Sequence, residues 1–182
     1  MLTETQKKEL EINIALDNFD SSGDDCKFIN LDGKWGIKCF TFKSTRNISY
    51  LCQQYASTFD MAPKVAYKFN IENLSSGEEN YCHMTEIATP LAAWGKLNKN
   101  CDGGCFSDEP EYDEYDEDLD ADYVAPYYEE RMEWVKKFKR LTGYKYEDFH
   151  TGNFGFLNNK LVCIDFTKTT KLLEIIEGLP CH

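Results

Sequence analysis

An acidic tract interrupts the chain between Asp108 and Asp122, where ten Asp and Glu residues occur without a single Lys or Arg. So much like charge cannot enter a hydrophobic core, so the folded parts of the chain must lie on either side of it. Residues 99–126, which surround the tract and are rich in glycine and acid, are therefore predicted to form an inserted loop. Without those ten charges the net charge of −12 would be about −2, so the rest of the chain is nearly neutral.

The acidic tract has three interpretations. It is a solvated insertion, a docking or autoinhibitory surface for a basic protein partner, or a calcium site built on alternate Asp residues from Asp116 to Asp122. The calcium interpretation is disfavoured, because the tract lacks the glycine that an EF-hand loop carries at its sixth position. Negative charge also disfavours nucleic-acid binding, although an inhibitor that mimics nucleic acid and binds a basic protein would fit the charge.

The composition indicates a globular protein of modest size. Of the 182 residues, 42% are hydrophobic and 14% aromatic, which suffices for one domain or two small lobes. No apolar run reaches the roughly 18 residues of a membrane-spanning helix, so no membrane partner is expected. The charged N-terminus does not resemble a signal peptide, and a cytoplasmic location is expected.

Most of the eight cysteines lie in apolar segments such as residues 37–42 and 161–166, where a thiol acts as a small buried hydrophobe. Without a secretion signal, reduced thiols are expected rather than disulfides. Cys101 and Cys105 form a C-x3-C pair, to which Cys82 and His83 could add ligands for zinc. A zinc site is disfavoured, because no second pair stands at finger-like spacing.

Hydrophobic periodicity predicts a small sheet with one inserted helix in the N-terminal half. Asp32-Gly33, between two apolar runs, predicts a hairpin in which both residues tolerate positive φ. A first helix is expected over residues 3–16, with Leu10, Ile14, Leu2 and Ile12 on or near its buried face. The other predicted elements are strands over 26–31, 34–42, 64–71 and 81–87 and a helix over 45–58, with Ile48, Leu51, Cys52 and Tyr55 facing inward.

The C-terminal half is predicted to contain three helices and a second hairpin. The helices are expected over residues 89–98, 127–141 and 169–178, and Gly143 suits the C-cap of the second one. The hairpin is expected to turn at Asn158-Asn159, after a loop over residues 144–153. The buried face of the second helix is expected to carry Met132, Val135, Phe138 and Leu141.

Asp148, Asn153 and Asp165 form the constellation with the most distinctive chemistry. Phosphoryl transfer requires a carboxylate that orients the acceptor, cations on the phosphates and oxygen ligands for magnesium. Asp148 and Asn153 stand five residues apart, and the hairpin that follows leads directly to Asp165. Asp165 leaves an apolar strand, where an unpaired carboxylate would be costly and a bound cation would offset that cost.

The segment from Tyr146 to Phe166, YEDFHTGNFGFLNNKLVCIDF, resembles the catalytic loop and metal-binding strand of the protein kinase-like superfamily. DFHTGN is similar to the D-x-H-x-G-N loop of its aminoglycoside-phosphotransferase-like members, and LVCIDF to their I-D-F metal motif. The resemblance implies that Asp148 is the catalytic base and that Asn153 and Asp165 hold Mg²⁺. It also implies that His150 is a structural or phosphate-proximal group beside the nucleotide.

Upstream residues extend the resemblance. Lys38, in the segment WGIK, stands where the family places the lysine of V-A-I-K, which implies a catalytic contact with the phosphates of ATP. The segment MTEIA at residues 84–88 resembles the hinge. The resemblance implies that the backbone of Glu86 and Ala88 binds adenine, with Thr85 as gatekeeper.

The sequence also departs from the family pattern. No G-x-G-x-x-G loop is present, and the helix after Lys38 has no Glu, with Gln53 or Gln54 as the nearest substitute. A neutral amide cannot pair with a lysine as a carboxylate does. Only 16 residues follow Phe166, which leaves no room for the family's substrate-binding helices, so the resemblance covers roughly residues 20–168.

The resemblance implies an α+β, bilobal kinase-like fold with a small antiparallel N-lobe sheet and a reduced helical C-lobe. Residues 1–88 would form the N-lobe and hinge, and residues 89–182 a truncated C-lobe with the acidic insertion at about 99–126. The favoured function is an ATP- and Mg²⁺-dependent phosphotransferase that acts on a protein hydroxyl or a small molecule. The alternative is a catalytically degenerate pseudokinase that binds or inhibits a partner through the insertion. The compact size and stripped design suggest a viral or mobile-element protein.

Overall fold

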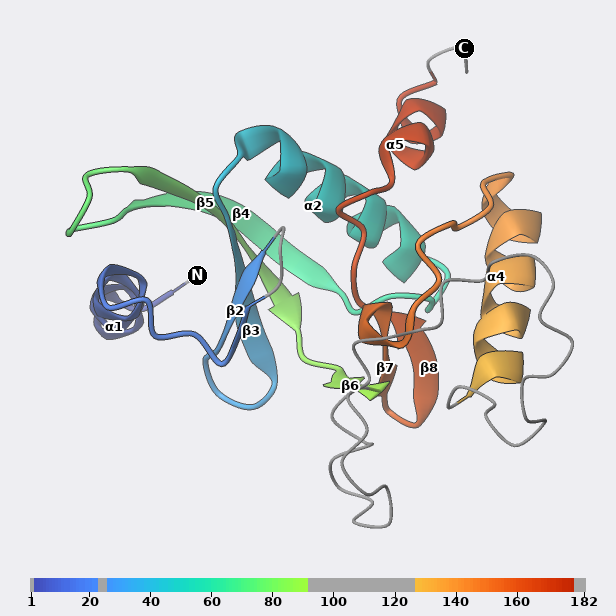
Figure 1. Ribbon diagram of the computed structural model, residues 1–182, viewed down its shortest axis with the longest axis horizontal. Helices are drawn as coiled ribbons and strands as arrows, with labels where there is room; N and C mark the ends of the chain where they lie inside the picture. Colours follow the sequence, from blue (N-terminus) through green and yellow to red (C-terminus); the bar gives the residue numbers. More distant parts are fainter. Residues whose placement is uncertain (1, 23–25, 92–126, 179–182) are drawn as a thin grey trace, which may run out of the picture. The chain divides into compact units, whose positions relative to one another are not determined.

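The computed structural model describes residues 2–22, 26–91 and 127–178, and its elements are labelled in Figure 1. The chain divides into two compact units, Met1–Ile87 with Asp165–His182, and Ala88–Ile164. Each unit contains one antiparallel sheet, which confirms the predicted α+β class. The first boundary falls next to the expected end of the N-lobe, whereas the last residues group with the first unit and not with residues 88–164. The acidic tract, Cys101 and Cys105 lie outside the described residues.

The first unit is built on a five-stranded sheet with the order β1-β2-β3-β5-β4. Asp32 and Gly33 turn β2 into β3, as predicted, but only Gly33 has a positive φ, of 79°. Asp32 acts through its side chain, because its Oδ1 accepts from the N–H groups of Lys34 and Trp35 at 3.0 and 2.7 Å. The strands are β1 (Ser21–Ser22), β2 (Lys27–Asn30), β3 (Trp35–Phe40), β4 (Val65–Glu72) and β5 (Glu79–Glu86).

Helix α1 (Glu4–Ala15) covers an apolar face of this sheet. Thr3 and Gln6 form a capping box at its N-terminus. Leu10 and Ile14 are buried in one cluster with side chains of β2 to β5, as predicted. The prediction for Ile12 is wrong: this side chain is 54% exposed, because it stands two residues from both buried positions and therefore points away.

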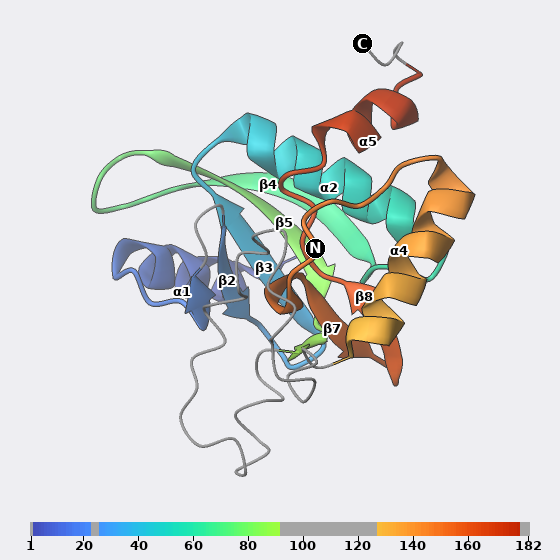
Figure 2. The same ribbon diagram turned by 45° about the vertical axis from the view of Figure 1, so that its right-hand side comes forward.

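Helix α2 (Lys43–Ser57) lies against side chains of alternate strand residues, which point to the opposite face from the α1 cluster. These strand residues are Lys38, Phe40, His83 and Thr85. The buried residues of α2 are Arg46, Ser49, Cys52, Gln53 and Ala56, so only Cys52 of the predicted inner face is fully buried. The helix turns its polar side inward because this face of the sheet is itself polar. Helix α5 (Thr170–Ile176), within the predicted final helix, contacts α2, and the Cys52 thiol donates to the Thr169 carbonyl at 3.6 Å (Figure 2).

The second unit contains the sheet β6-β7-β8 and helix α4. The predicted hairpin is confirmed, since β7 and β8 turn through Asn158 and Asn159 with φ of 52° and 61°. The predicted helix over 89–98 is wrong at its start, where Thr89 and Pro90 pair with β7 as a strand; its residues after Leu91 lie outside the described chain. The element bounds are β6 (Thr89–Pro90), α4 (Tyr128–Thr142), β7 (Phe154–Leu157) and β8 (Lys160–Cys163).

Helix α4 buries a face that overlaps the predicted one: Val135 and Phe138 are buried as predicted, whereas Met132 is only half-buried. Its buried residues are Arg131, Trp134, Val135, Phe138 and Thr142, whereas Leu141 is 43% exposed. Gly143 ends the helix with φ of 78°, as expected for a C-cap glycine. In the part of the chain that the structure describes, no helix has the length and apolar character needed to cross a membrane.

Candidate functional site

Two aromatic residues fix the ends of the predicted catalytic loop. Tyr146 and Phe154 are buried, and their ring centroids lie 5.9 Å apart in an edge-to-face arrangement. The Trp134 ring of α4 packs on both, at 5.6 Å from Tyr146 and 5.4 Å from Phe154. Such aromatic pairs stabilise beyond their buried area. The loop between them is therefore held at both ends by one aromatic cluster.

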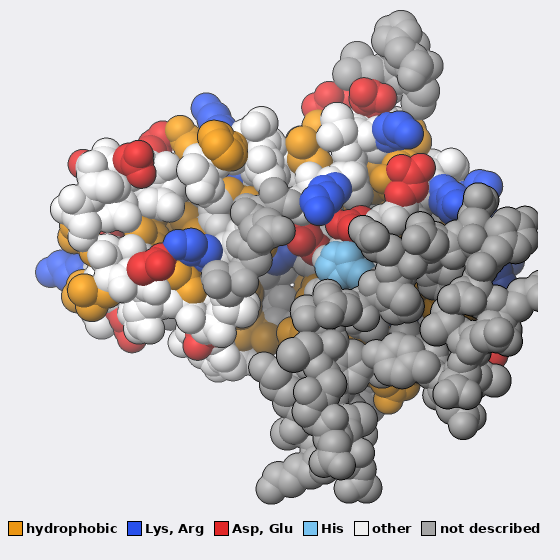
Figure 3. All heavy atoms as spheres, in the orientation of Figure 1, with side chains coloured by type: hydrophobic (Ala, Val, Ile, Leu, Met, Phe, Trp, Pro, Cys, Tyr) orange, Lys and Arg blue, Asp and Glu red, His pale blue; other side chains and the backbone are white. Residues whose placement is uncertain are grey.

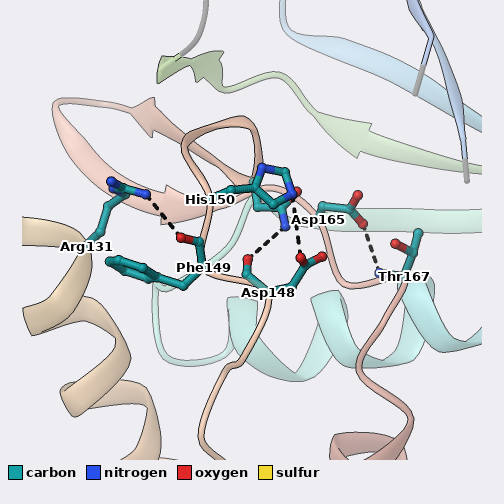
Figure 4. A network of polar contacts seen from close by, with 7 residues as sticks. Arg131, Asp148, Phe149, His150, Asp165 and Thr167 are labelled. Atoms are coloured by element: carbon teal, nitrogen blue, oxygen red, sulfur yellow. Dashed lines mark hydrogen bonds and ion pairs between the residues drawn. The ribbon is translucent and has the colours of Figure 1, made fainter. Parts of the chain in front are cut away.

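Arg131 supports the middle of the loop from α4 (Figure 4). Its Nη1 donates to the Phe149 carbonyl at 3.3 Å, and its guanidinium carbon lies 4.5 Å from the centre of the Phe149 ring. The side chain is only 1% exposed. Sequence reasoning missed Arg131, although its position three residues before Trp134 places a cation on the buried face of α4.

Asn153 closes the loop onto Asp148. Its Nδ2 donates to the Asp148 carbonyl at 2.9 Å, and the N–H of His150 donates to the same carbonyl at 3.2 Å. Asn153 is 3% exposed and ends the short 3-10 turn Thr151–Asn153. Because Nδ2 is the donor, the amide is oriented with Oδ1, the atom able to bind a cation, on its other side.

The Asp148 and His150 side chains reach the surface of the loop. Their side chains are 25% and 45% exposed, and His150 Nε2 lies 3.6 Å from Asp148 Oδ1. This separation exceeds hydrogen-bond length but lies within ion-pair distance when the imidazole is protonated. Asp148 thus presents a carboxylate that an acceptor hydroxyl could approach.

The end of the hairpin is joined to the loop through the backbone. The N–H of Ile164 donates to the Asn153 carbonyl at 2.8 Å, and Asp165 is the next residue in the chain. Asp165 belongs to the first unit, where its Oδ1 accepts from the Thr167 N–H at 2.9 Å. This bond orders the chain immediately after β8.

Lys38 is 8% exposed on β3, and its register partner on β5 is His83. Gln53, proposed as the substitute for the missing helix Glu, forms its hydrogen bonds with other residues than Lys38. Its Nε2 donates to the Thr85 hydroxyl at 2.7 Å and to the Pro63 carbonyl at 3.0 Å. Its Oε1 is buried without a hydrogen-bond partner, so Gln53 accepts no bond from Lys38.

The predicted hinge residues continue the sheet. The N–H of Glu86 donates to the Lys64 carbonyl at 2.9 Å, and its carbonyl accepts from the Thr85 hydroxyl at 3.2 Å. Its carboxylate accepts from the Lys64 N–H at 3.1 Å. Both backbone groups of Glu86 thus have partners within the first unit, while Ala88 begins the second unit and is 8% exposed.

The predicted catalytic, nucleotide-binding and metal-binding residues therefore belong to two different units. Asp148, His150, Asn153 and Ala88 lie in the second, and Lys38, Glu86 and Asp165 in the first. Within the described ranges, no group of three or more His, Cys, Asp or Glu side chains is placed to hold a metal ion. Magnesium commonly takes one or two protein oxygens and completes its shell with phosphates and water, so the oxygens of Asn153 and Asp165 are of the right kind for it.

Cys82 and His83 are unsuitable as joint zinc ligands. They are consecutive residues of β5, so their side chains point to opposite faces of the sheet. Among the described residues, Cys39, Cys52 and Cys82 are buried cysteines that form no disulfide.

Charged side chains of both signs are interspersed on the face drawn in Figure 3, and the coloured residues show no extended basic patch there. No family model matches the sequence, and no curated protein or solved structure is detectably similar to the chain.

Proposed function

We propose that the protein is an ATP- and Mg²⁺-dependent phosphotransferase with a bilobal, kinase-like fold, which acts on a protein hydroxyl or a small molecule. The observation that carries this proposal is the loop from Asp148 to Asn153. The Asn153 side chain closes the loop by donating to the Asp148 carbonyl at 2.9 Å. The Asn153 carbonyl accepts from the N–H of Ile164, the residue before Asp165. A carboxylate, an amide oxygen and a second carboxylate thus occur in the order and spacing of the kinase-like motif that the segment resembles, and they are the kinds of group that phosphoryl transfer uses.

Each side chain has a distinct role in this proposal. Asp148 accepts the proton of the acceptor hydroxyl, and His150 lies beside it, with Nε2 3.6 Å from Asp148 Oδ1. Asn153 and Asp165 supply oxygen ligands, and Lys38 supplies positive charge for the phosphates. MgATP, when bound, supplies the transferable phosphoryl group.

Nucleotide binding is the first test, by titration calorimetry of the full chain with ATP and Mg²⁺. We expect saturable binding that requires Mg²⁺ and weakens at least tenfold in Asp165→Ala, because removing a ligand carboxylate costs about 1.4 kcal/mol or more. Absence of binding by the wild type at millimolar ATP would exclude the enzyme.

Phosphoryl transfer is the second test, with Asp148→Asn compared to Glu147→Gln. Glu147 is an exposed neighbour in the same loop, so its substitution is a matched control for loss of one carboxylate. We expect Asp148→Asn to lower kcat roughly 10²–10⁴-fold while nucleotide affinity is kept, as for removal of a general base. Equal activity of the two variants would show that Asp148 is not the base.

A second candidate is a pseudokinase that acts by contact, and the bonding of Gln53 favours it. The amide binds Thr85 and Pro63 and offers no charge to orient Lys38. On this alternative, nucleotide binding occurs weakly or not at all, and a basic partner binds the tract from Asp108 to Asp122. Pull-downs with the tract intact and deleted test this; an unchanged set of partners would make the tract a passive insertion.

A further inference from the structure

Cys39 and Cys82 face each other across two adjacent strands of the first unit. They are register partners in the antiparallel pair β3 and β5, and both side chains point toward the α1 side of the sheet. The Cys82 thiol donates to the Cys39 sulfur at a distance of 3.3 Å. Their exposed fractions are 0% for Cys82 and 3% for Cys39. Two thiols are thus held in contact by the register of the sheet.

The backbone spacing suits a bond between these sulfurs. Directly opposed residues of antiparallel strands have Cα atoms about 4.5–5.5 Å apart. Disulfides span Cα separations of roughly 4.4–6.8 Å, so the strands need not separate or slide. Only a rotation of the side chains is needed to bring the sulfurs from 3.3 Å to bonding distance.

A small cavity borders Cys39. Its volume is about 100 Å³, and Cys39 lines it together with Phe19, Cys26, Lys27 and Asn80. That is several times the roughly 30 Å³ that one water molecule occupies in the liquid, so a molecule as small as hydrogen peroxide fits. A small oxidant in this cavity would therefore lie beside Cys39 while the sheet stays closed.

We propose that Cys39 and Cys82 form a reversible cross-strand disulfide when hydrogen peroxide enters this cavity. The Cys39 sulfur attacks one peroxide oxygen, the O–O bond breaks, and a sulfenic acid and one water are formed. The Cys82 sulfur then attacks the Cys39 sulfur and displaces hydroxide, which takes up the Cys82 proton and leaves as a second water. Two thiols are oxidised by one electron each, and one peroxide is reduced to two waters.

The pair is protected at rest. The neighbouring Cys82 thiol and burial raise the pKa of Cys39 well above its usual range. Since the thiolate is the reactive form, the pair stays reduced until peroxide is abundant. Once formed, the bond joins β3 to β5 one residue from both Lys38 and His83, and it closes a loop that contains α2 and β4.

The test is a disulfide map of the full-length protein. The folded chain is treated with millimolar hydrogen peroxide, free thiols are blocked with N-ethylmaleimide, and the protein is digested with trypsin without reduction. Cleavage after Lys38, Lys43, Lys68 and Lys96 places Cys39 in residues 39–43 and Cys82 in residues 69–96, each as the sole cysteine of its peptide. We expect one linked species, lighter than the two thiol peptides by two hydrogen atoms and abolished by dithiothreitol.

Other outcomes overturn the proposal. No linked species after treatment, in a protein that keeps its circular dichroism spectrum, would show that peroxide does not join the pair. A link from Cys39 to Cys26 instead would assign the reaction to another couple. Because the map uses wild-type protein, it does not depend on the folding of a variant.

Two variants and one physical readout complete the experiment. Cys82→Ser should abolish the link, whereas Cys163→Ser, which alters a buried thiol of the second unit, should retain it. The oxidised wild type should melt roughly 5–10 °C higher than the reduced protein, because the closed loop restricts the unfolded chain. A linked protein with an unchanged Tm would refute the claim that the disulfide between β3 and β5 stabilises the fold.

Discussion

His83 makes the stability of the first unit depend on pH. Its side chain is 0% exposed, and neither ring nitrogen has a hydrogen-bond partner. The ring packs against Phe40 and Tyr50, with centroid distances of 5.4 and 5.7 Å. Burial lowers the pKa of His83 well below its ordinary value of 6.5, and the charges of Lys38 and Arg46 lower it further. The folded protein therefore holds the imidazole neutral.

The direction of the pH effect follows from proton binding. The unfolded chain protonates His83 as the pH falls below about 6.5, whereas the folded protein does not until the lowered pKa is reached. Between these values the unfolded state binds more protons, so stability is complete above about pH 6.5 and falls as the pH is lowered. The slope approaches about 1.4 kcal/mol per pH unit, which gives a loss of about 2 kcal/mol between pH 8 and pH 5.

His83→Phe removes the titrating group and keeps an aromatic ring between Phe40 and Tyr50. It also removes two buried nitrogens without partners, a cost of about 1–3 kcal/mol in the wild type. We expect the variant to exceed the wild type in unfolding free energy by about 1–3 kcal/mol at pH 8 and by about 3–5 kcal/mol at pH 5. Urea denaturation followed by circular dichroism measures both differences.

The change in this gap between the two pH values is decisive, because the other titrating groups are common to both proteins. A gap that does not widen at pH 5 would refute the reasoning, as would an NMR titration that places the His83 pKa at or above 6.5. His150→Gln is the control. Its side chain is 45% exposed in the second unit, so the loss of stability assigned to His83 should remain.

Three further substitutions test the packing. Arg131→Lys should lower the unfolding free energy by about 1–3 kcal/mol, because an ammonium cannot keep both the hydrogen bond to the Phe149 carbonyl and the contact with the Phe149 ring. Its control, Arg140→Lys on the exposed side of α4, should change the unfolding free energy by less than about 0.5 kcal/mol. Gly155→Ala should cost about 1–3 kcal/mol in chemical denaturation, since an added Cβ would lie 2.7 Å from a backbone oxygen of β6. Thr3→Ala should cost about 1 kcal/mol in the same assay through loss of the capping box of α1; an unchanged midpoint would mean that α1 is not held at this end.

The longer strands and helices of both units could be predicted, because turn residues and local periodicity mark them, but the two-residue strands β1 and β6 could not. The buried faces of α2 and α4 could be predicted only in part. In α2 the apolar residues Ile48, Leu51 and Tyr55 suggested the buried stripe, but Arg46 and Gln53 are more deeply buried. The choice of face is made by partners distant in sequence: Arg46 binds the Phe69 and Cys82 carbonyls, 23 and 36 residues away.

In the candidate site, too, local features could be predicted from the sequence, whereas contacts between distant residues could not. The closure of the loop by Asn153 follows from local spacing, because a short loop brings residues five apart into contact. The support from Arg131 spans 18 residues and depends on how α4 packs against the loop, which no local pattern specifies. The hydrogen bond from Gln53 to Thr85 likewise depends on the sheet that packs against α2.

The division of the chain also has a consequence for synthesis on the ribosome. Residues 88–164 are inserted into the first unit, whose last helix α5 lies beyond them in the chain. The sheet and α2 can form early, but the contact of Cys52 with Thr169 must wait until the whole inserted unit has emerged. During that interval, part of α2 remains uncovered and available to chaperones. Early arrest of translation would therefore leave a partly assembled first unit.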